Sequence, residues 1–390
     1  MTRVRVPPQS IGLISIILTA IFAPLTASMV GRGGDYVLHL RYALLWEQDG
    51  LWGKPLPHFL YQSLLIVFKG LLPGQNFFLA AAVIITFSYL VLGLTLYILY
   101  YHLLPNFHPK KRVMSAIILT VIIMLVAPIN LLTRNAQNQY FGYIAIQSYH
   151  NPTMILLRPL ALWLFLFAVR VFRDKLTSVP LVLLCTAIAM LLCITKPNYG
   201  IAILPALTLL TLVGLYRKKP IDWRLLLVGI VVPIVTVIIW QYFFYRSQGI
   251  GGFSIAPFQV MNFLSPIPGS LLPKFLLSCA FPLCVLVLYF KTVTLDIALR
   301  LAWIAFMFGV FYTYFLMDTL VWQAGNFIWS GEITLFLLFV TSAFFVLRQY
   351  IAARKWTWQL TVCAVVLTLH LICGLAFYPL HFSDNWNSWY

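Results

Sequence analysis

The chain has little charge and few acidic residues, and these shortages exclude most classes of soluble protein. Asp, Glu, Lys and Arg make up 9% of its 390 residues, whereas a soluble domain holds about 25%. No CxxC pair, HExxH, GxSxG or glycine-rich phosphate loop is present, so thiolate zinc sites, zinc proteases, serine hydrolases and P-loop enzymes have no support. All six cysteines lie inside apolar runs, and we therefore expect no disulfide.

Apolar residues, at 62% of the chain, take the place of the missing charge. Runs of roughly 20 apolar residues recur from end to end, and each is long enough to cross a bilayer as a helix. The first run follows the basic segment MTRVRVPPQS but is longer than the apolar core of a signal peptide, so we expect it to be retained. The sequence thus predicts an all-α polytopic membrane protein with a single transmembrane domain over residues 1–390. Its eleven predicted spans are residues 11–30, 77–100, 113–132, 154–172, 179–195, 201–216, 225–245, 275–290, 299–317, 333–347 and 360–377.

The net charge of +17 is distributed unevenly between the two sides of this arrangement. Alternate loops hold 17 of the 26 basic residues and three acids, Asp174, Asp222 and Asp296, while the opposite loops hold the other nine basic residues and six acids. This is the positive-inside pattern, which predicts a cytoplasmic N-terminus and an outer C-terminus. The lack of an obvious targeting peptide and of exposed cysteines favours a bacterial inner membrane, with an organelle membrane as the alternative. Basic clusters beside a membrane attract anionic headgroups, so membrane lipids and not nucleic acid are the expected partners.

Residues 31–76 form the first outer loop, and two helices are expected inside it. Residues 35–49 have helical periodicity and end at a run rich in Gly and Pro. Residues 58–72 are apolar but too short for a full span, which indicates a helix in the membrane interface or a re-entrant segment. Asp35 and His39 stand four residues apart on one face of the first helix, so both side chains point the same way.

The pair of Asp35 and His39 is the first candidate for chemistry. Together they could act as a base with an orienting partner, or supply two ligands to a divalent ion. Alternatively, Asp35 only caps the helix, because an acid near a helix N-terminus is stabilising. Capping and catalysis are compatible with each other.

Further polar residues gather at the predicted outer ends of the spans, as expected along a water-filled cavity or a substrate path. His58 begins the second interfacial helix. His150 and Asn151 precede Pro-Thr where a span starts, although Asn, Pro and Thr are also ordinary helix-initiating residues. Arg158 lies one to two turns into the same span, where a guanidinium needs an anion or an array of carbonyl groups.

Two more segments at the outer ends could contact a substrate. Lys196, Asn198 and Tyr199 interrupt an apolar hairpin in the segment KPNY, where the lysine either offers a cation to a phosphate or extends to the membrane surface. Asn326 and Glu332 lie in GNFIWSGE, whose tryptophans are typical of the membrane interface and are also able to stack on sugar rings.

The segment GGDYVLHLRYA contains Asp35, and the segment PLPHFLYQSLL contains His58. In these segments and in its layout, the chain resembles the membrane-embedded C-type glycosyltransferase (GT-C) superfamily, whose bacterial members take sugars from polyprenyl phosphate. The shared features are a cytoplasmic N-terminus, a first span, a large first outer loop with two interfacial helices, and an acid early in that loop. The chain departs from the family in lacking the paired acids often found there, and no large extramembrane domain follows the last predicted span.

The resemblance implies a transferase that moves a sugar from a polyprenyl-phosphate donor to a glycan or lipid acceptor at the outer face. Asp35 would be the general base on the acceptor hydroxyl, with inversion at the anomeric carbon, and His39 would orient Asp35. Arg158 and Lys196 would hold the phosphate leaving group, where negative charge develops. The other residues expected near the substrate are His58, His150, Asn151, Asn198, Tyr199, Asn326 and Glu332. The sequence indicates no specific cofactor, and the missing paired acids leave a divalent metal open.

Two other functions fit a chain of this composition. A lipid or polysaccharide transporter or flippase should carry ionisable residues in mid-span or an inverted repeat, and Arg158 and His370 are the main residues of that kind. A polysaccharide polymerase or ligase usually concentrates arginines in a large late outer loop, but residues 246–274 hold two basic residues, one at each end. The polar groups at the outer ends therefore favour the transferase.

Overall fold

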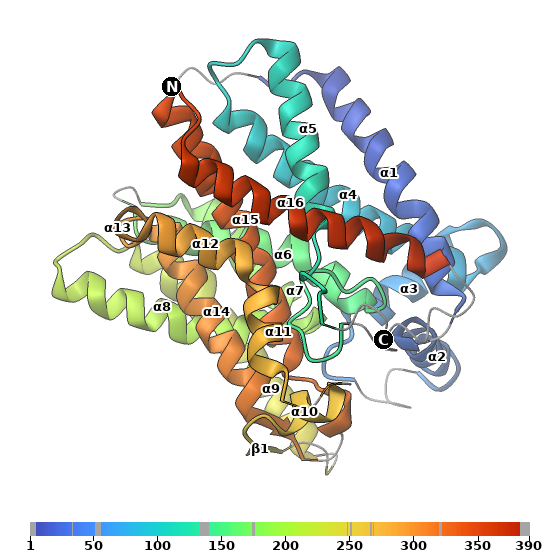
Figure 1. The fold of residues 1–390 in the computed structure, drawn as a ribbon. Helices are drawn as coiled ribbons and strands as arrows, with labels where there is room; N and C mark the ends of the chain where they lie inside the picture. The colour runs from blue at the N-terminus through green and yellow to red at the C-terminus, as the bar shows by residue number, and fades with distance from the viewer. Residues whose placement is uncertain are drawn as a thin grey trace.

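The computed structural model describes residues 5–32, 34–50, 56–132, 140–173, 176–247, 249, 252–265, 267, 269–319 and 322–382 (Figure 1). The helices of the first half are α1 (Pro8–Val30), α2 (Gly34–Asp49), α3 (Leu60–Leu71), the 3-10 turn η1 (Pro73–Gln75), α4 (Phe77–Leu103), α5 (Pro109–Leu125), α6 (Pro152–Arg170), α7 (Val179–Thr195) and α8 (Asn198–Tyr216). Those of the second half are the π-helical segment η2 (Leu225–Val231), α9 (Val232–Ser247), α10 (Gln259–Leu264), α11 (Leu271–Ser278), α12 (Ala280–Leu288), α13 (Phe290–Val293), α14 (Ile297–Phe315), η3 (Trp322–Ala324), α15 (Ile328–Ala353), α16 (Trp358–Phe377) and η4 (Tyr378–Phe382). Within the described ranges, the strands are β1 (Phe253–Ile255) and β2 (Leu316–Asp318), which pair antiparallel.

The helices confirm an all-α, multi-pass membrane protein. In the described part of the chain, eight helices are long and apolar enough to cross a bilayer: α1, α4, α6, α8, the continuous helix of η2 and α9, α14, α15, and α16 with η4. The bent pair of α11 and α12 would make a ninth. The other two predicted spans correspond to α5 and α7, each 17 residues long. At 1.5 Å per residue they cover about 26 Å of a hydrocarbon core that is about 30 Å thick, so the count of eleven stays a prediction.

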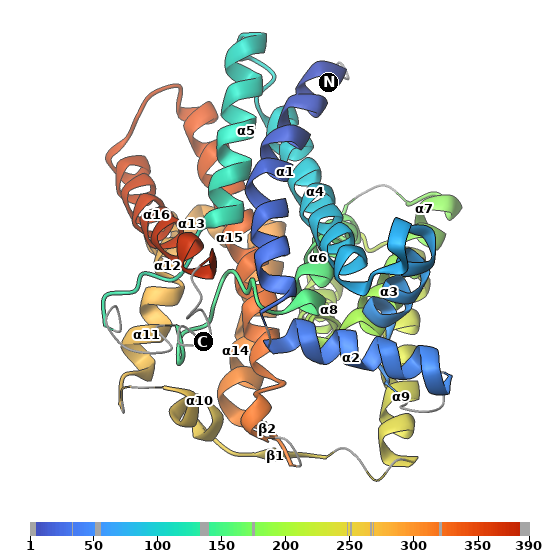
Figure 2. The ribbon, with the colours of Figure 1, turned by 90° about the vertical axis from the view of Figure 1, so that its right-hand side faces the viewer.

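Helix α2 lies across one end of α1 instead of continuing along it. Figure 2 shows α1, α4 and α5 running beside one another, with α2 crossing the lower end of α1. An ion pair of 2.5 Å between Lys69 Nζ of α3 and Glu47 Oε2 of α2 joins the two short helices. The described part of residues 31–76 thus holds two separate α-helices, α2 and α3, besides the 3-10 turn η1, and the place of these α-helices at a membrane surface stays a prediction.

Several helix starts are set by side chains that accept backbone hydrogen bonds. Asn76 caps α4, Asp296 caps α14 and Thr357 caps α16, and each accepts from a backbone N–H two or three residues further on. Asn151 caps α6 in the same way, with Pro152 as the first helical residue. The helix-initiating role of Asn151 and Pro152 is therefore confirmed, whatever else they do.

The predicted span 275–290 is wrong as a straight helix, because the chain bends by 70° between α11 and α12. Cys279 separates the two helices. Pro282, in the first turn of α12, has no N–H to donate to the carbonyl of Ser278, and its ring crowds that carbonyl. Pro282 thus removes one helical hydrogen bond at the break, as prolines inside the continuous helices α1, α6 and α8 also do.

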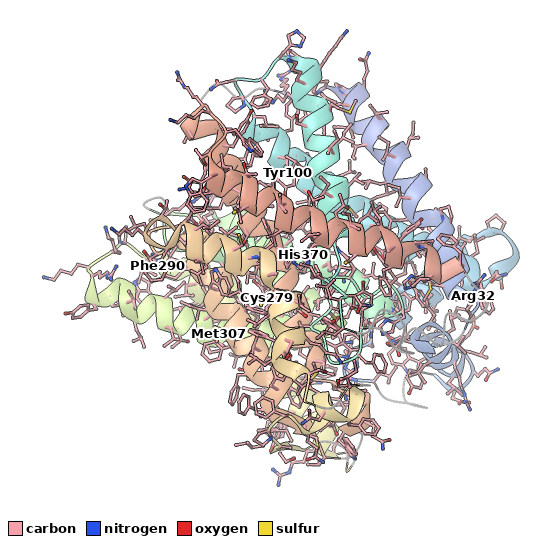
Figure 3. All side chains as sticks on the ribbon, viewed as in Figure 1. Arg32, Tyr100, Cys279, Phe290, Met307 and His370 are labelled. Atoms are coloured by element: carbon pink, nitrogen blue, oxygen red, sulfur yellow. The ribbon has the colours of Figure 1, made fainter. Side chains whose placement is uncertain are left out.

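A histidine of α16 supports this break. The Nδ1 of His370 lies 2.7 Å from the carbonyl oxygen of Ala127, and its Nε2 accepts a hydrogen bond of 3.3 Å from the N–H of Phe281. The neutral ring with its proton on Nδ1 satisfies both contacts. The N–H of Ala127 also donates to the carbonyl of His370, at 3.1 Å. Figure 3 shows His370 beside Cys279 at this junction, so this mid-span histidine has a structural role.

Helix α5 ends at Leu125, short of the predicted end of its span at residue 132. Beyond it the N–H of Ile129 donates to the carbonyl of Leu277 at 3.1 Å, which ties the chain to α11. Gly374 of α16 permits the close approach to α5, because a Cβ at that position would lie 1.7 Å from the carbonyl oxygen of Leu125. The span ends early because α11 and α16 take over the hydrogen bonds of its last residues.

The buried carboxylate of Asp222 ties the connection between α6 and α7 to the start of η2. Its Oδ2 accepts from the N–H of Thr177 at 2.7 Å, and its Oδ1 accepts from the N–H of Leu225 at 3.1 Å. The guanidinium of Arg224 donates to the carbonyl of Thr177 in the same cluster. Burial raises the pKa of Asp222, but the hydrogen bonds from Leu225 and Thr177 and the charge of Arg224 outweigh it and hold this pKa below its usual value.

Replacing Asp222 by Ala is expected to destabilise the protein by about 1–3 kcal/mol, because it leaves buried backbone donors without acceptors. Since the folded pKa of Asp222 is depressed, its charge contributes stability above the unfolded pKa of about 3.9, and this contribution is lost as the pH falls through the folded pKa. Thermal unfolding in detergent at neutral and acidic pH measures both effects. A variant that unfolds at the wild-type temperature would contradict the expectation.

Candidate functional site

A cavity of about 220 Å³ lies where α2, α15 and the segment before α6 meet. Asp35 of α2, His150 of that segment and Glu332 of α15 all line it, so the fold brings together three of the predicted residues. The other lining residues are mainly aromatic or aliphatic: Tyr140, Phe141, Gly142, Tyr143, Ala145, Gln147, Ser148, Met261, Leu264, Gln323, Gly325, Ile328, Trp329 and Phe377. An apolar hollow with a few polar groups is the usual form of a small-molecule site.

The carboxylate of Asp35 is held by an amide from a distant part of the sequence. Asn151 Nδ2 donates to Asp35 Oδ2 at 2.6 Å. Asp35 also lies in the first turn of α2, which begins at Gly34 with a φ of 64°. The carboxylate therefore interacts favourably with the positive end of the α2 dipole, and it also lines the cavity.

Lys196, in the connection between α7 and α8, brings a cation to this region, although it is not among the described residues that line the cavity. Its Nζ lies 4.2 Å from the centre of the Trp329 ring and 3.4 Å from Thr153 Oγ1. Burial lowers the pKa of Lys196 to about 8, against the opposing attraction of Asp35 and Glu332 for the protonated form. The ammonium is therefore mainly protonated at pH 7 and loses its proton as the pH rises through about 8.

Glu332 is the second acid that lines the cavity. Its Oε2 accepts a hydrogen bond from Ser148 Oγ, and the residue is 6% exposed. Glu332 follows Trp329 by three positions on α15, so both side chains reach the same wall. Arg158 and Lys196 are close enough to interact electrostatically with this carboxyl group.

Arg158 is buried beside the cavity but is not among the described residues that line it. Its Nη1 donates to Gln147 Oε1 at 2.5 Å, and its Nη2 donates to the carbonyl of Ile146 at 3.0 Å. Gln147 Nε2 in turn donates to the carbonyl of Ile123 at 3.1 Å. The carbonyl array that the buried guanidinium requires is therefore present, and it belongs to the segment that forms the cavity wall.

His39 and His58 also lie outside the described lining of the cavity. His39 Nδ1 is 2.6 Å from Gln62 Nε2 of α3, and His58 Nδ1 is 3.4 Å from the hydroxyl of Tyr245 on α9. Burial lowers the pKa of His39 to about 4 and that of His58 to about 3. Both imidazoles are therefore neutral at pH 7 and do not act as cations there.

His150 borders the cavity next to Trp329, with 5.8 Å between the ring centres. Burial lowers the pKa of His150; the charge of Asp35 opposes this, and those of Lys196 and Arg158 reinforce it. His150 thus presents a neutral ring to the cavity, suited to hydrogen bonding with a hydroxyl group.

Asn198, Tyr199 and Asn326 connect α8 to the start of α15. Asn198 Nδ2 donates to the carbonyl of Asn326 at 2.8 Å and to Ser330 Oγ at 3.0 Å. Tyr199 is fully buried next to Asn198. None of the three is among the described lining residues, and the contacts of Asn198 instead fix the turn of α15 that carries Trp329.

Sequence reasoning missed Gln147, Ser148 and Lys274. Gln147 and Ser148 stand just before His150 and Asn151. Their polar side chains in a predicted outer loop were the signal that could have identified them as site residues. Lys274 is fully buried on α11, where its Nζ donates to the carbonyl of Phe141 at 3.0 Å and to Ser265 Oγ at 2.6 Å. Lys274 therefore supports the cavity wall, a contact that its sequence neighbourhood does not indicate.

Across the described ranges, no three His, Cys, Asp or Glu residues come together as ligands for a metal ion. Asp35 and His39, the predicted two-ligand pair, are engaged with Asn151 and Gln62 respectively.

In comparisons with known proteins, no family model, no curated protein and no solved structure matches the chain.

Proposed function

We propose that this protein is a glycosyltransferase of the GT-C type, which moves a sugar from a polyprenyl-phosphate donor to a glycan or lipid acceptor at the outer face of a bacterial inner membrane. The observation that carries the proposal is the small aromatic-walled cavity that Asp35 and Glu332 line, with Lys196 beside it. Displacement at a sugar carbon needs a base for the incoming hydroxyl and a cation for the leaving phosphate. Asp35 and Lys196 supply these two charges.

Asp35 acts as the general base in this proposal. Its carboxylate takes the proton of the acceptor hydroxyl while the oxygen attacks the anomeric carbon. The bond between that carbon and the phosphate oxygen breaks, and polyprenyl phosphate leaves with the electron pair. Direct displacement inverts the anomeric configuration. His39 supports α2 through Gln62 and is not required as a proton carrier.

Lys196 is the cation assigned to the leaving phosphate. It lies against Trp329, which lines the cavity, and within electrostatic range of Asp35. Negative charge grows on the phosphate oxygen as the sugar leaves, and a fixed ammonium stabilises that charge. Arg158 holds Ile146 and Gln147, so it positions the cavity wall and does not bind phosphate itself.

The size and lining of the cavity support a single sugar ring as the occupant. About 220 Å³ is below the lower end, ~300 Å³, of the pockets that hold drug-sized ligands. Trp329, Tyr140 and Tyr143 offer aromatic faces for stacking, while His150 and Glu332 offer hydrogen-bonding groups to hydroxyls.

Purified protein in nanodiscs tests the proposal when it is given a panel of polyprenyl-phosphate hexoses together with glycan and lipid acceptors. Release of free polyprenyl phosphate is expected from at least one donor, and NMR of the product should show an inverted anomeric centre. The absence of release from every donor would count against the transferase.

A transporter or flippase without chemistry is the second candidate, because α11 and α12 form a broken span. Discontinuous helices are typical of transporter binding sites, and this break lies on the same chain segment as Lys274, which supports the cavity wall. Lipid that copurifies and moves between leaflets, without any release of polyprenyl phosphate, would favour this function.

The transfer rate is expected to fall as the pH rises through about 8, because Lys196 loses its proton there. Lys196→Arg should move this descending limb to higher pH, since a guanidinium stays protonated, and Lys196→Met should lower the rate at every pH. Steady-state rates across the pH range measure both effects, and superimposable profiles for wild type and Lys196→Arg would contradict the assignment.

Stability provides the control for this pH experiment. The folded pKa of Lys196, about 8, lies below its ordinary value of 10.5, so the unfolded state binds more protons between these values. The contribution of Lys196 to stability therefore rises with pH across that window, and thermal unfolding should show no loss there from this group. A falling rate without a falling unfolding temperature is then due to the cation.

A further inference from the structure

Asn151 joins the start of α6 to the carboxylate of Asp35. Its Oδ1 accepts two hydrogen bonds, from the N–H of Met154 at 2.9 Å and from Thr153 Oγ1 at 2.8 Å. Its Nδ2 donates to Asp35 Oδ2 at 2.6 Å. Because both donors require an oxygen at that position, the amide has one orientation and its NH2 group faces Asp35. The residue is 3% exposed, so water does not compete freely for these bonds.

We infer that Asn151 is a positioning residue for Asp35 and acts through this carboxylate, not by contact with sugar or phosphate; the inference rests on the proposed function. Among the described residues, Asp35 and His150 line the cavity and Asn151 does not. The amide donates to Oδ2 of Asp35 and so fixes the orientation of both carboxylate oxygens relative to the cavity. A charge-assisted hydrogen bond of this kind fixes the direction in which the base presents its lone pairs.

The same network links the base to the cation. Thr153 Oγ1 donates to Asn151 Oδ1 and accepts from Lys196 Nζ at 3.4 Å. Asp35 and Lys196 are therefore both tied to the first turn of α6, one through Asn151 and the other through Thr153. The first turn of α6 therefore sets the spacing between Asp35, the base, and Lys196, the group that holds the leaving phosphate.

Two substitutions separate the capping role of Asn151 from its positioning role. Ser and Asp cap a helix about as well as Asn does, but neither carries the amide that donates to Asp35. Losing a hydrogen bond to a charged group corresponds to roughly a ten- to hundred-fold fall in kcat, with KM little changed. We expect this fall in both Asn151→Ser and Asn151→Asp.

Asn151→Asp should also move the acid limb of the rate profile to higher pH, because a second carboxylate beside Asp35 disfavours its ionised form. The titratable and charged groups among the described residues that face Asp35 or share its cavity are Tyr36, His39, Tyr140, Tyr143, His150, Lys196 and Glu332. The two histidines are neutral at pH 7, and Lys196 titrates at about 8, on the other limb. Adding Glu332→Gln to the variant shows how much of the shift comes from the second acid of the cavity.

Asn76 offers a matched control, because it caps α4 with the same chemistry away from the cavity. Its Oδ1 accepts from the N–H groups of Phe78 and Leu79 at 2.7 and 3.3 Å. Asn76→Ser and Asn76→Asp should keep the wild-type kcat and pH profile. Thermal unfolding of all four variants shows whether the caps are equivalent.

A second readout does not depend on transferase activity. Carbodiimide labelling of Asp35, followed by mass spectrometry across pH, reports the protonation of this carboxyl group. The inference is supported if the labelling midpoint moves to higher pH in Asn151→Asp but not in Asn76→Asp. This holds even if the protein turns over no donor, a result that would contradict only the proposed function. Unchanged labelling together with unchanged kcat in Asn151→Asp would overturn the inference. A change confined to KM would also overturn it. If Asn151→Asp does not fold, Asn151→Ser is judged by the same criteria.

Discussion

Asp35→Asn is expected to lower the rate of sugar transfer by about 10²- to 10⁴-fold, the usual contribution of a positioned general base. The amide has nearly the size of the carboxylate, and its oxygen can still accept the hydrogen bond from Asn151. The substitution therefore keeps the start of α2 and its contact with α6, and removes the group that takes the proton. Single-turnover release of polyprenyl phosphate measures the loss separately from donor binding.

Asp49→Asn is the matched control, because Asp49 is exposed at the other end of α2. It should retain the full rate. Glu332→Gln tests whether the second acid of the cavity is the base instead. Full activity in Asp35→Asn, together with a large loss in Glu332→Gln, would move the catalytic role from α2 to α15.

Gly374→Ala is expected to prevent normal packing of α16, with a loss of stability above ~3 kcal/mol, beyond the usual range for overpacking. A Cβ at this position would lie 1.7 Å from the carbonyl oxygen of Leu125, 2.8 Å from its carbonyl carbon and 3.2 Å from the nitrogen of Ala127. These atoms are backbone and cannot rotate aside. Helices α5 and α16 would have to separate, which would also break the hydrogen bonds between Ala127 and His370.

The fraction of monodisperse protein in detergent and its unfolding temperature measure this effect. Gly12→Ala on α1 is the control, because a Cβ there meets no atom within 4 Å of the described structure. In that exposed helical position Ala should be neutral or stabilising by up to ~1 kcal/mol. Normal yield and stability of Gly374→Ala would show that α16 is not packed as described.

The positions of the long helices could be predicted because the bilayer imposes its own length scale on apolar segments. The predicted span 179–195 has the bounds of α7, and residues 35–49 correspond to α2. The break at Cys279 could not be predicted in the same way. A proline at the start of an apolar run is ordinary in membrane helices, and the partner that stabilises the break, His370, lies on another helix.

The candidate base could also be singled out, whereas its surroundings could not. Asp35 stood out because an acid is costly to keep in so apolar a chain. Its partner Asn151 is 116 positions away, and no local spacing predicts such a contact. In the sequence, Arg158 and Lys196 are equivalent cations near outer helix ends. In the structure, Arg158 donates hydrogen bonds to Ile146 and Gln147, whereas Lys196 lies against the ring of Trp329.

The junction at His370 also constrains the order in which the protein is made. Ribosomes deliver Ala127 and the break between α11 and α12 to the membrane well before α16 exists. Until α16 arrives, the N–H and carbonyl of Ala127 lack the partners that His370 provides, and each unmatched backbone group in hydrocarbon costs several kcal/mol. This junction therefore closes only after α16 has been translated, and a nascent chain stalled before residue 358 would leave these two backbone groups of Ala127 without those partners.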